Sequence, residues 1–225
     1  TAALHWLNSI PNALICEFVA EEETSLRRQQ ARDEVKPVLF QVKKGECVGL
    51  SGRSGIGKTQ LLRAVTDLIP HQGTISLDGR TCSSYPAPVW RSMVTMVAAD
   101  SSWWYDRVGE HFDVVAGDTF IDTYFPLMGL EKEMMGWQVR RLSTGERQRL
   151  ALLRALQRKP AVLLLDEPSS GLDRYHTDLL ERCVAGWRQE KNISIIWVSH
   201  DPEQLKRVAM RELRMEADGL AELGA

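Results

Sequence analysis

The chain has 225 residues, of which 44% are hydrophobic and 26% are charged, and its formal net charge is −2. This balance supplies enough apolar material for a packed core and excludes a disordered or low-complexity chain. The near-zero charge gives no reason to expect nucleic acid as a partner. The longest apolar run, Ala161–Leu165, has five residues, far short of the roughly 20 that a membrane-spanning helix needs.

Short apolar strands alternate with amphipathic helices along most of the chain. The pattern predicts strands at residues 14–20, 38–42, 46–51, 73–79, 93–98, 162–165 and 193–198. It predicts helices at residues 58–69, 145–157, 174–189 and 202–208, and a charged, solvated stretch at 21–34. Such alternation implies an α/β fold with a mostly parallel sheet covered by helices on both faces. Aromatics, glycines and mixed helical signals at about 100–142 predict an inserted helical subdomain within one domain, 1–225.

A glycine-rich motif follows the predicted strand 46–51 and opens the predicted helix 58–69. It matches G-x-x-x-x-G-K-[ST], and strand–loop–helix is the context that this phosphate-binding loop requires. Its residues are Gly52, Arg53, Ser54, Gly55, Ile56, Gly57, Lys58 and Thr59, with Gln60 next in the chain. Backbone N–H groups of such a loop cradle phosphate oxygens, the lysine supplies a positive charge, and the Thr59 hydroxyl is a magnesium ligand. An ordinary glycine-rich turn is the alternative, but a chance match is rare. The motif predicts that the chain binds ATP with Mg²⁺.

Polar side chains follow two further predicted strands. Asp166 and Glu167 come directly after the apolar run 162–165, and His200 follows the strand 193–198. Ligands of such sheets bind at the carboxyl ends of the strands. We therefore expect Asp166 to hold magnesium, Glu167 to act as the general base toward water, and His200 to contact the γ-phosphate. Solvated acids and a structural histidine are the alternatives.

The segment Leu142-Ser143-Thr144-Gly145-Glu146 resembles the L-S-G-G-Q signature of the ABC ATPases, and Ser169-Ser170-Gly171-Leu172-Asp173 resembles the D-loop of that family. These motifs occur in the family's order, so the chain resembles an ABC ATPase over nearly its whole length. The resemblance implies an N-terminal antiparallel β portion and two domains that sandwich two ATP molecules as a homodimer. It also implies that Ser143 and Gly145 of one subunit contact the γ-phosphate held by the other, while Asp173 crosses the interface and positions Glu167.

The chain departs from the family pattern at several positions. Thr144 and Glu146 replace small or neutral residues of the signature, and Glu146 adds a negative charge near the expected phosphate. Ala99 stands where the family has a glutamine, so we expect slow or partner-dependent hydrolysis. Arg27 and Arg28 occupy the stretch where the family stacks an aromatic ring on adenine. An arginine plane can replace that ring, and a solvated charged loop is the alternative.

Three consecutive aromatic residues, Trp103, Trp104 and Tyr105, follow Ala99. Three neighbours cannot all enter one core from a loop, so some are expected to be exposed and to contact a partner. In transporters of the family, this region receives a helix from the integral membrane subunit. A local aromatic core is the alternative.

The leading functional prediction is the ATP-hydrolysing subunit of a bacterial ABC transporter, and the subgroup that the chain resembles is the small iron or metal exporters. The four scattered cysteines without a C-x-x-C pair, and the absence of a signal-peptide pattern at the start, lead us to expect a cytoplasmic, peripheral protein on the inner membrane. The alternatives are a soluble ABC-type ATPase of an assembly or repair system and a weakly hydrolysing, nucleotide-binding regulatory module. A P-loop kinase is a more distant alternative, because it would not need the signature or Asp173.

Overall fold

The computed structural model describes residues 14–20, 38–113, 119–217 and 219–223.

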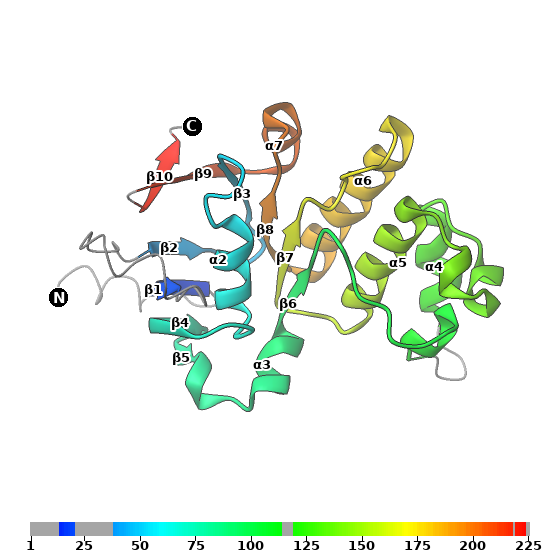
Figure 1. Cartoon of the computed structure of the whole chain (residues 1–225), viewed down its shortest axis with the longest axis horizontal. Helices are drawn as coiled ribbons and strands as arrows, with labels where there is room; N and C mark the ends of the chain where they lie inside the picture. The colour runs from blue at the N-terminus through cyan, green and yellow to red at the C-terminus, as the bar shows by residue number, and fades with distance from the viewer. Residues whose placement is uncertain (1–13, 21–37, 114–118, 218, 224–225) are drawn as a thin grey trace.

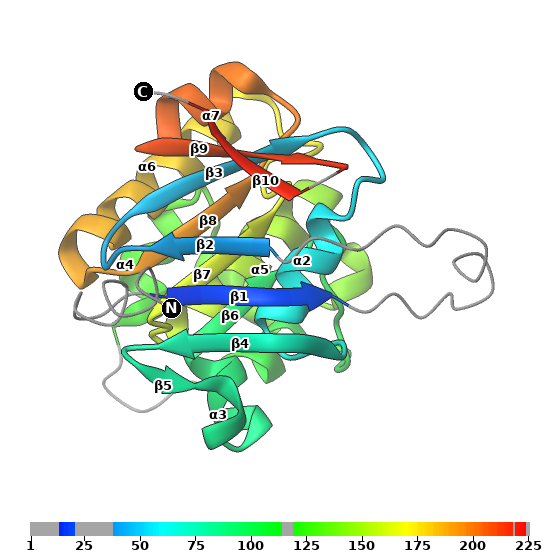
Figure 2. The ribbon, with the colours of Figure 1, turned by 90° about the vertical axis from the view of Figure 1, so that its left-hand side faces the viewer.

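A four-stranded antiparallel sheet forms one side of the molecule. The sheet has the order β2-β1-β4-β5 and faces the viewer in Figure 2. Its strands are β1 Leu14–Ala20, β2 Val38–Val42, β4 His71–Leu77 and β5 Arg80–Thr81. Cys16 lies opposite Phe40 on one side and Ile75 on the other. The expected N-terminal antiparallel portion is confirmed.

A six-stranded, mostly parallel sheet carries the strands that end near the sequence motifs. Its order is β10-β9-β3-β8-β7-β6, and only β10 runs antiparallel to its neighbour. The strands are β3 Cys47–Gly52, β6 Val94–Val97, β7 Val162–Asp166, β8 Ser194–Val198, β9 Arg211–Glu216 and β10 Gly219–Leu223. All residues of β7 and β8 are buried, as expected for central strands covered on both faces.

Helices cover both faces of this sheet, as predicted (Figure 1). The α-helices are α2 Lys58–Val65, α3 Ala87–Met93, α4 Phe120–Leu127, α5 Thr144–Gln157, α6 Arg174–Lys191 and α7 Pro202–Val208. None of the helices in the described segments is long and apolar enough to cross a membrane.

Helix α2 packs between the two sheets. Its buried residues Leu61, Leu62 and Val65 join one hydrophobic core with side chains from β1, β3 and β8. Trp90 of α3 is fully buried in this core, and its Nε1 donates a hydrogen bond to the Val65 carbonyl oxygen at 3.0 Å. The core fixes α2 directly behind the phosphate loop.

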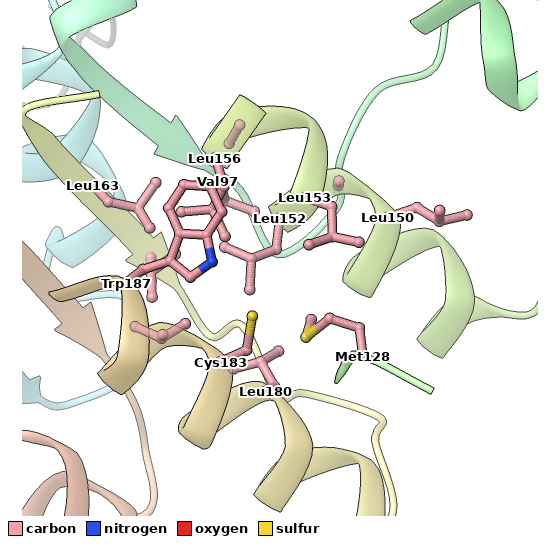
Figure 3. Close-up of a cluster of buried hydrophobic side chains, with 14 of the residues drawn as sticks. Val97, Met128, Leu150, Leu152, Leu153, Leu156, Leu163, Leu180, Cys183 and Trp187 are labelled. Atoms are coloured by element: carbon pink, nitrogen blue, oxygen red, sulfur yellow. The ribbon is translucent and has the colours of Figure 1, made fainter. Parts of the chain in front are cut away.

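Helices α5 and α6 pack on the opposite face of the sheet around a second core (Figure 3). Leu152 and Leu156 of α5 meet Leu180 and Trp187 of α6 there. The segment 100–142 contributes to this same core through Val108, Phe125 and Met128, among others. Its described elements are α4 and the 3₁₀ helices η2 Val108–His111, η3 Lys132–Gly136 and η4 Val139–Arg141.

Helix α2 is shorter than its apolar spacing predicted. It ends at Val65 rather than at residue 69. The Thr66 hydroxyl donates to the Leu62 carbonyl oxygen at 2.9 Å, and Asp67 adopts a left-handed conformation with φ of 56°. A left-handed residue cannot continue a right-handed helix, so the predicted boundary was wrong.

The packing of α5 against α6 leads to a stability prediction. Leu152→Ala removes a side chain that is 0% exposed, and it is expected to lower the free energy of unfolding by about 2–5 kcal/mol because a cavity remains. Leu127→Ala is the matched control, since Leu127 is also helical but 52% exposed. Urea denaturation of both variants measures the difference. Equal losses in the two variants would contradict this account of the core.

Candidate active site

The phosphate loop begins where β3 ends and finishes where α2 begins. Gly52 has φ of 145°, and a Cβ at this position would lie 2.8 Å from the Met215 carbonyl oxygen, so only glycine fits. Lys58 is the first residue of α2, and its Nζ donates to the carbonyl oxygens of Gly52 and Arg53 at 2.8 and 3.1 Å. The rest of the motif fills the loop and the first turn of α2: Ser54, Gly55, Ile56, Gly57, Thr59 and Gln60.

The Lys58 ammonium is the positive charge at the centre of the loop. Burial lowers its pKa, and the neighbouring carboxylates of Glu167 and Asp166 oppose that shift. An ammonium at the start of a helix, within a glycine-rich loop, is suited to an anionic ligand such as a phosphate group.

Thr59 and Asp166 meet although they lie 107 positions apart in the chain, since the Thr59 Oγ1 donates to Asp166 Oδ2 at 2.8 Å. Asp166 ends β7, and its side chain is buried beside α2. A hydroxyl and a carboxylate are the hard oxygen ligands that Mg²⁺ prefers. Among the described residues, no cluster of three acidic, histidine or cysteine side chains could hold a metal ion alone. The pair therefore fits an ion that takes its remaining ligands from phosphate and water.

Glu167 and His200 face each other at the carboxyl ends of β7 and β8. Glu167 Oε1 lies 3.5 Å from His200 Nε2, and this oxygen is buried without a hydrogen-bond partner in the described part of the chain. Burial raises the pKa of Glu167, and the nearby His200 opposes that rise. Glu167 also has a left-handed φ of 50°, which is uncommon outside glycine and turns the chain sharply after β7. A poorly solvated carboxylate with an unused acceptor oxygen can take a proton from water.

Gln148 links helix α5 to this acid, a contact that the sequence analysis did not predict. The Gln148 Nε2 donates to the Glu167 carbonyl oxygen at 2.9 Å, and Gln148 is 4% exposed. The position of Glu167 is therefore tied to the helix that begins at the signature.

The signature forms the start of α5. The Ser143 Oγ accepts a hydrogen bond from the Glu146 N–H at 3.2 Å, while the Glu146 carboxylate accepts from the Ser143 N–H at 2.7 Å. This reciprocal capping box satisfies two free donors of the helix end. The Glu146 charge, which we expected to lie near phosphate, is thus turned back onto its own helix.

Gly145 makes room for the D-loop. A Cβ at Gly145 would lie 2.8 Å from Leu172 Cδ2, so a larger residue would require the Leu172 side chain to move. Arg149, one turn later, is buried and donates to the carbonyl oxygens of Gly145, Met128 and Gly129. Its burial lowers the pKa of the guanidinium. The signature is therefore fixed both to the D-loop and to the end of α4.

Asp173 caps α6. One carboxylate oxygen accepts from the His176 N–H at 2.9 Å, and the other lies 2.8 Å from His176 Nδ1. These two hydrogen bonds lower the pKa of Asp173. The carboxylate remains exposed, so it lies on the surface where a second molecule can reach it.

The aromatic segment after β6 is arranged around His111. The rings of Trp103, Trp104 and Tyr105 lie 4.8, 4.9 and 5.2 Å from the imidazole, and Arg154 stacks on both tryptophans. The His111 Nε2 accepts the N–H groups of Trp104 and Tyr105 at 3.0 and 3.1 Å. Trp103 packs on the core, whereas Trp104 and Tyr105 are 58% and 52% exposed. The expectation that some of these rings are exposed is met.

Ala99 lies at the carboxyl end of the same sheet. Val97, the last residue of β6, is paired with Leu165, and Ala99 follows two positions beyond the end of the strand. Its methyl group is exposed and offers no polar atom to a ligand or water. Arg27 and Arg28 lie outside the described residues.

The structure therefore brings one set of motif residues together and places a second set away from the first. The phosphate loop, Asp166, Glu167 and His200 converge at the carboxyl ends of β3, β7 and β8. The signature lies at the start of α5, on the face of the sheet opposite α2 (Figure 1). No hydrogen bond joins Ser143, Gly145 or Asp173 to the phosphate loop in the described part of the chain.

Comparison with known proteins agrees with this arrangement of motifs. A family model described as ABC transporter matches residues 35–170. The chain belongs to the ABC transporter family. Within that family it is an ATP-binding subunit, the part that energises transport, and membership implies ATP hydrolysis and work with a permease partner.

Relatives of this family member include both exporters and importers. The chain is 30% identical to the probable iron export ATP-binding protein FetA of Escherichia coli over 180 residues, which cover 75% of this chain and 78% of FetA. It is also 30% identical to the methionine import ATP-binding protein MetN 1 of Listeria monocytogenes over 204 residues, 84% of this chain but only 60% of that protein.

Two solved structures have the same fold. A bacterial Atm1-family ABC exporter with ATP bound matches with a TM-score of 0.78 at 21% identity, covering 96% of this chain and 39% of the exporter. The cbiO1 protein of Clostridium perfringens, part of the ABC transporter complex cbiONQ, matches with a TM-score of 0.75 at 20% identity, covering 94% and 87% of the two chains. The predicted ABC fold is confirmed.

His111 provides a pH prediction. Its Nε2 must stay unprotonated to accept two N–H groups, and burial lowers its pKa. The stabilisation is therefore full above the usual histidine pKa of about 6.5 and is lost as the pH falls. His111→Gln keeps an acceptor that does not titrate, so the stability gap between wild type and variant should narrow from pH 8 to pH 5. Urea denaturation measures the gap, and a constant gap would contradict this role of His111.

Proposed function

We propose that this chain is the ATP-hydrolysing subunit of a bacterial ABC transporter, acting as one nucleotide-binding domain over residues 1–225. It binds ATP, closes as a homodimer, and works from the cytoplasmic face of the inner membrane with an integral membrane permease. The observation that carries the proposal is the convergence of Lys58, Thr59, Asp166 and Glu167 at one edge of the sheet. Family membership supports the same function.

Hydrolysis needs a base, a phosphate cradle and charge compensation. The unpartnered Oε1 of Glu167 takes a proton from a water molecule while the oxygen of that water attacks the γ-phosphorus. The bond between the γ-phosphorus and the bridging β-phosphate oxygen then breaks. Lys58 and the loop N–H groups stabilise the charge that develops on the phosphate oxygens. His200, 3.5 Å from Glu167, is exposed toward the same side and contacts the γ-phosphate.

Thr59 and Asp166 would hold the magnesium ion. The ion would supply Lewis-acid stabilisation of the β- and γ-phosphate oxygens. The 2.8 Å separation of the two side-chain oxygens supports this assignment, because both can face one cation.

The exposed capping residues support the homodimer. Ser143 and Asp173 lie on the surface at the starts of α5 and α6, where N–H groups form an anion-binding end. They have no partner in the phosphate loop of their own chain. We propose that Ser143 and Gly145 contact the γ-phosphate bound by a second copy, and that Asp173 crosses to position the second copy's Glu167.

Ala99 sets the rate in this proposal. Its methyl group can neither orient water nor ligate magnesium, so we propose slow hydrolysis that a partner accelerates. Arg27 or Arg28 stacks on the adenine in place of an aromatic ring.

The catalytic assignment predicts the effect of Glu167→Gln. The amide keeps the size of the side chain but cannot accept a proton, so the ATPase rate should fall about 100-fold or more while ATP binding persists. Light scattering should show ATP-dependent dimers of the variant. Gln72→Glu, which exchanges the same two side chains at an exposed position of β4, should leave the rate unchanged. An unaltered rate in Glu167→Gln would exclude Glu167 as the base and favour a regulatory module.

The docking assignment predicts that Trp104 and Tyr105 bind the membrane subunit. A tagged Glu167→Gln protein with ATP should retain an integral membrane protein from detergent-solubilised membranes. Trp104→Ala with Tyr105→Ala should lose it, whereas Leu68→Ala, which changes another exposed side chain (54%), should not. Retention of soluble proteins alone would favour the assembly or repair ATPase instead.

A further inference from the structure

A pocket separate from the phosphate loop lies between helices α6 and α7, and none of its lining residues belongs to that loop. It has a volume of about 350 Å³ and a mixed wall. Val184, Ala185 and Val208 supply apolar surface, and the Trp197 ring of β8 closes it toward the sheet. We refer to this site as the α6–α7 pocket. Its size suits a small organic molecule.

The pocket carries uncompensated positive charge. Arg182, Arg188 and Arg207 all line it, with Glu181 as the acid among them. Glu181 pairs with Arg207 at 2.8 Å, and Asp178 and Asp201 lie near Arg207 as well. Arg188 instead donates to neutral groups, the Gly45 carbonyl oxygen and the Met210 sulfur. No hydrogen bond or ion pair engages the exposed Arg182 guanidinium within the described segments. Two guanidinium charges thus remain for a ligand.

The acidic wall of the pocket is connected to the D-loop. Glu181 accepts from Gln204 Nε2 at 2.9 Å, and Gln204 in turn hydrogen-bonds Ser169 at 2.8 Å. Ser169 follows Glu167 by two positions, and Gln204 is 2% exposed. A carboxylate held by Arg182 and Arg188 would lie in the same pocket as the Glu181 carboxylate, and the repulsion between the two like charges would alter this chain of hydrogen bonds.

We propose that the α6–α7 pocket binds a small organic carboxylate with an aromatic or aliphatic body, and that its occupancy changes the rate of ATP hydrolysis. The carboxylate pairs with Arg182 and Arg188, and the body packs on Ala185 and Val208. The effect on rate rests on the proposed function, whereas binding itself does not.

Isothermal titration calorimetry with 1-naphthoate tests the site without any need for hydrolysis. Wild type should bind one equivalent, while acetate, which has no apolar body, and 1-naphthalenemethanol, which has no charge, should bind at least tenfold more weakly. Arg182→Glu and Ala185→Phe remove the charge and the space, and each should weaken binding at least tenfold. Lys191→Glu makes the same charge change elsewhere on α6 and should leave binding intact.

The outcomes separate the parts of the proposal. No binding to wild type, or binding that both pocket variants retain, would overturn the site. Binding that leaves the ATPase rate of wild type unchanged would overturn the effector role. A rate change in wild type that Arg182→Glu abolishes, with Arg182→Glu still hydrolysing ATP at the basal rate, would support both. Absence of hydrolysis in every variant would count against the proposed function and leave the calorimetric result to decide the site.

Discussion

The hydrogen bond from Thr59 to Asp166 is the contact on which the active site depends. It joins the first turn of α2 to the end of β7, two elements that lie far apart in the sequence. The contact requires that β3, β8 and β7 run parallel and side by side, so that their carboxyl ends share one edge. The phosphate loop, the pair Thr59–Asp166 and the pair Glu167–His200 all lie at that edge because of this register.

The second half of the site is built from helix ends on the opposite face. Ser143 and Asp173 cap α5 and α6, and these caps stabilise their own helices before any nucleotide binds. Gly145, Leu172 and Gln148 then connect the caps to the D-loop and to Glu167. A residue that caps a helix on the surface can also meet a ligand held by a second copy. Structural and proposed functional roles therefore coincide at these positions, and a substitution there would affect both stability and hydrolysis.

The sequence predicted most of the fold because the buried strands carry strong apolar runs between glycines and acids. Strands β1 and β2 and helix α7 have the predicted bounds. Strands β9 and β10 were missed, since β9 buries only Leu213 and its charged residues conceal the alternation. Helix α3 was also missed, because it is short and begins among prolines. The phosphate loop, Asp166, Glu167 and His200 were predicted from their spacing, whereas Ser143, Gly145 and Asp173 were predicted from the resemblance to the ABC ATPases. The sequence did not predict the supporting contacts, because they depend on tertiary packing or on which backbone group a side chain faces. These contacts are made by Gln148, Arg149, His111 and His176.

The central claim is that the edge formed by β3, β7 and β8 binds the phosphates of ATP through Lys58. The most direct measurement is equilibrium binding of a fluorescent ATP analogue to wild type and to Lys58→Ala, with Lys44→Ala, an exposed lysine of the β2–β3 turn, as the control. We predict that Lys58→Ala weakens binding about ten- to a hundredfold, since a charged hydrogen bond contributes about 1.5–3 kcal/mol, and that Lys44→Ala has no effect. Equal affinity of wild type and Lys58→Ala would contradict the account.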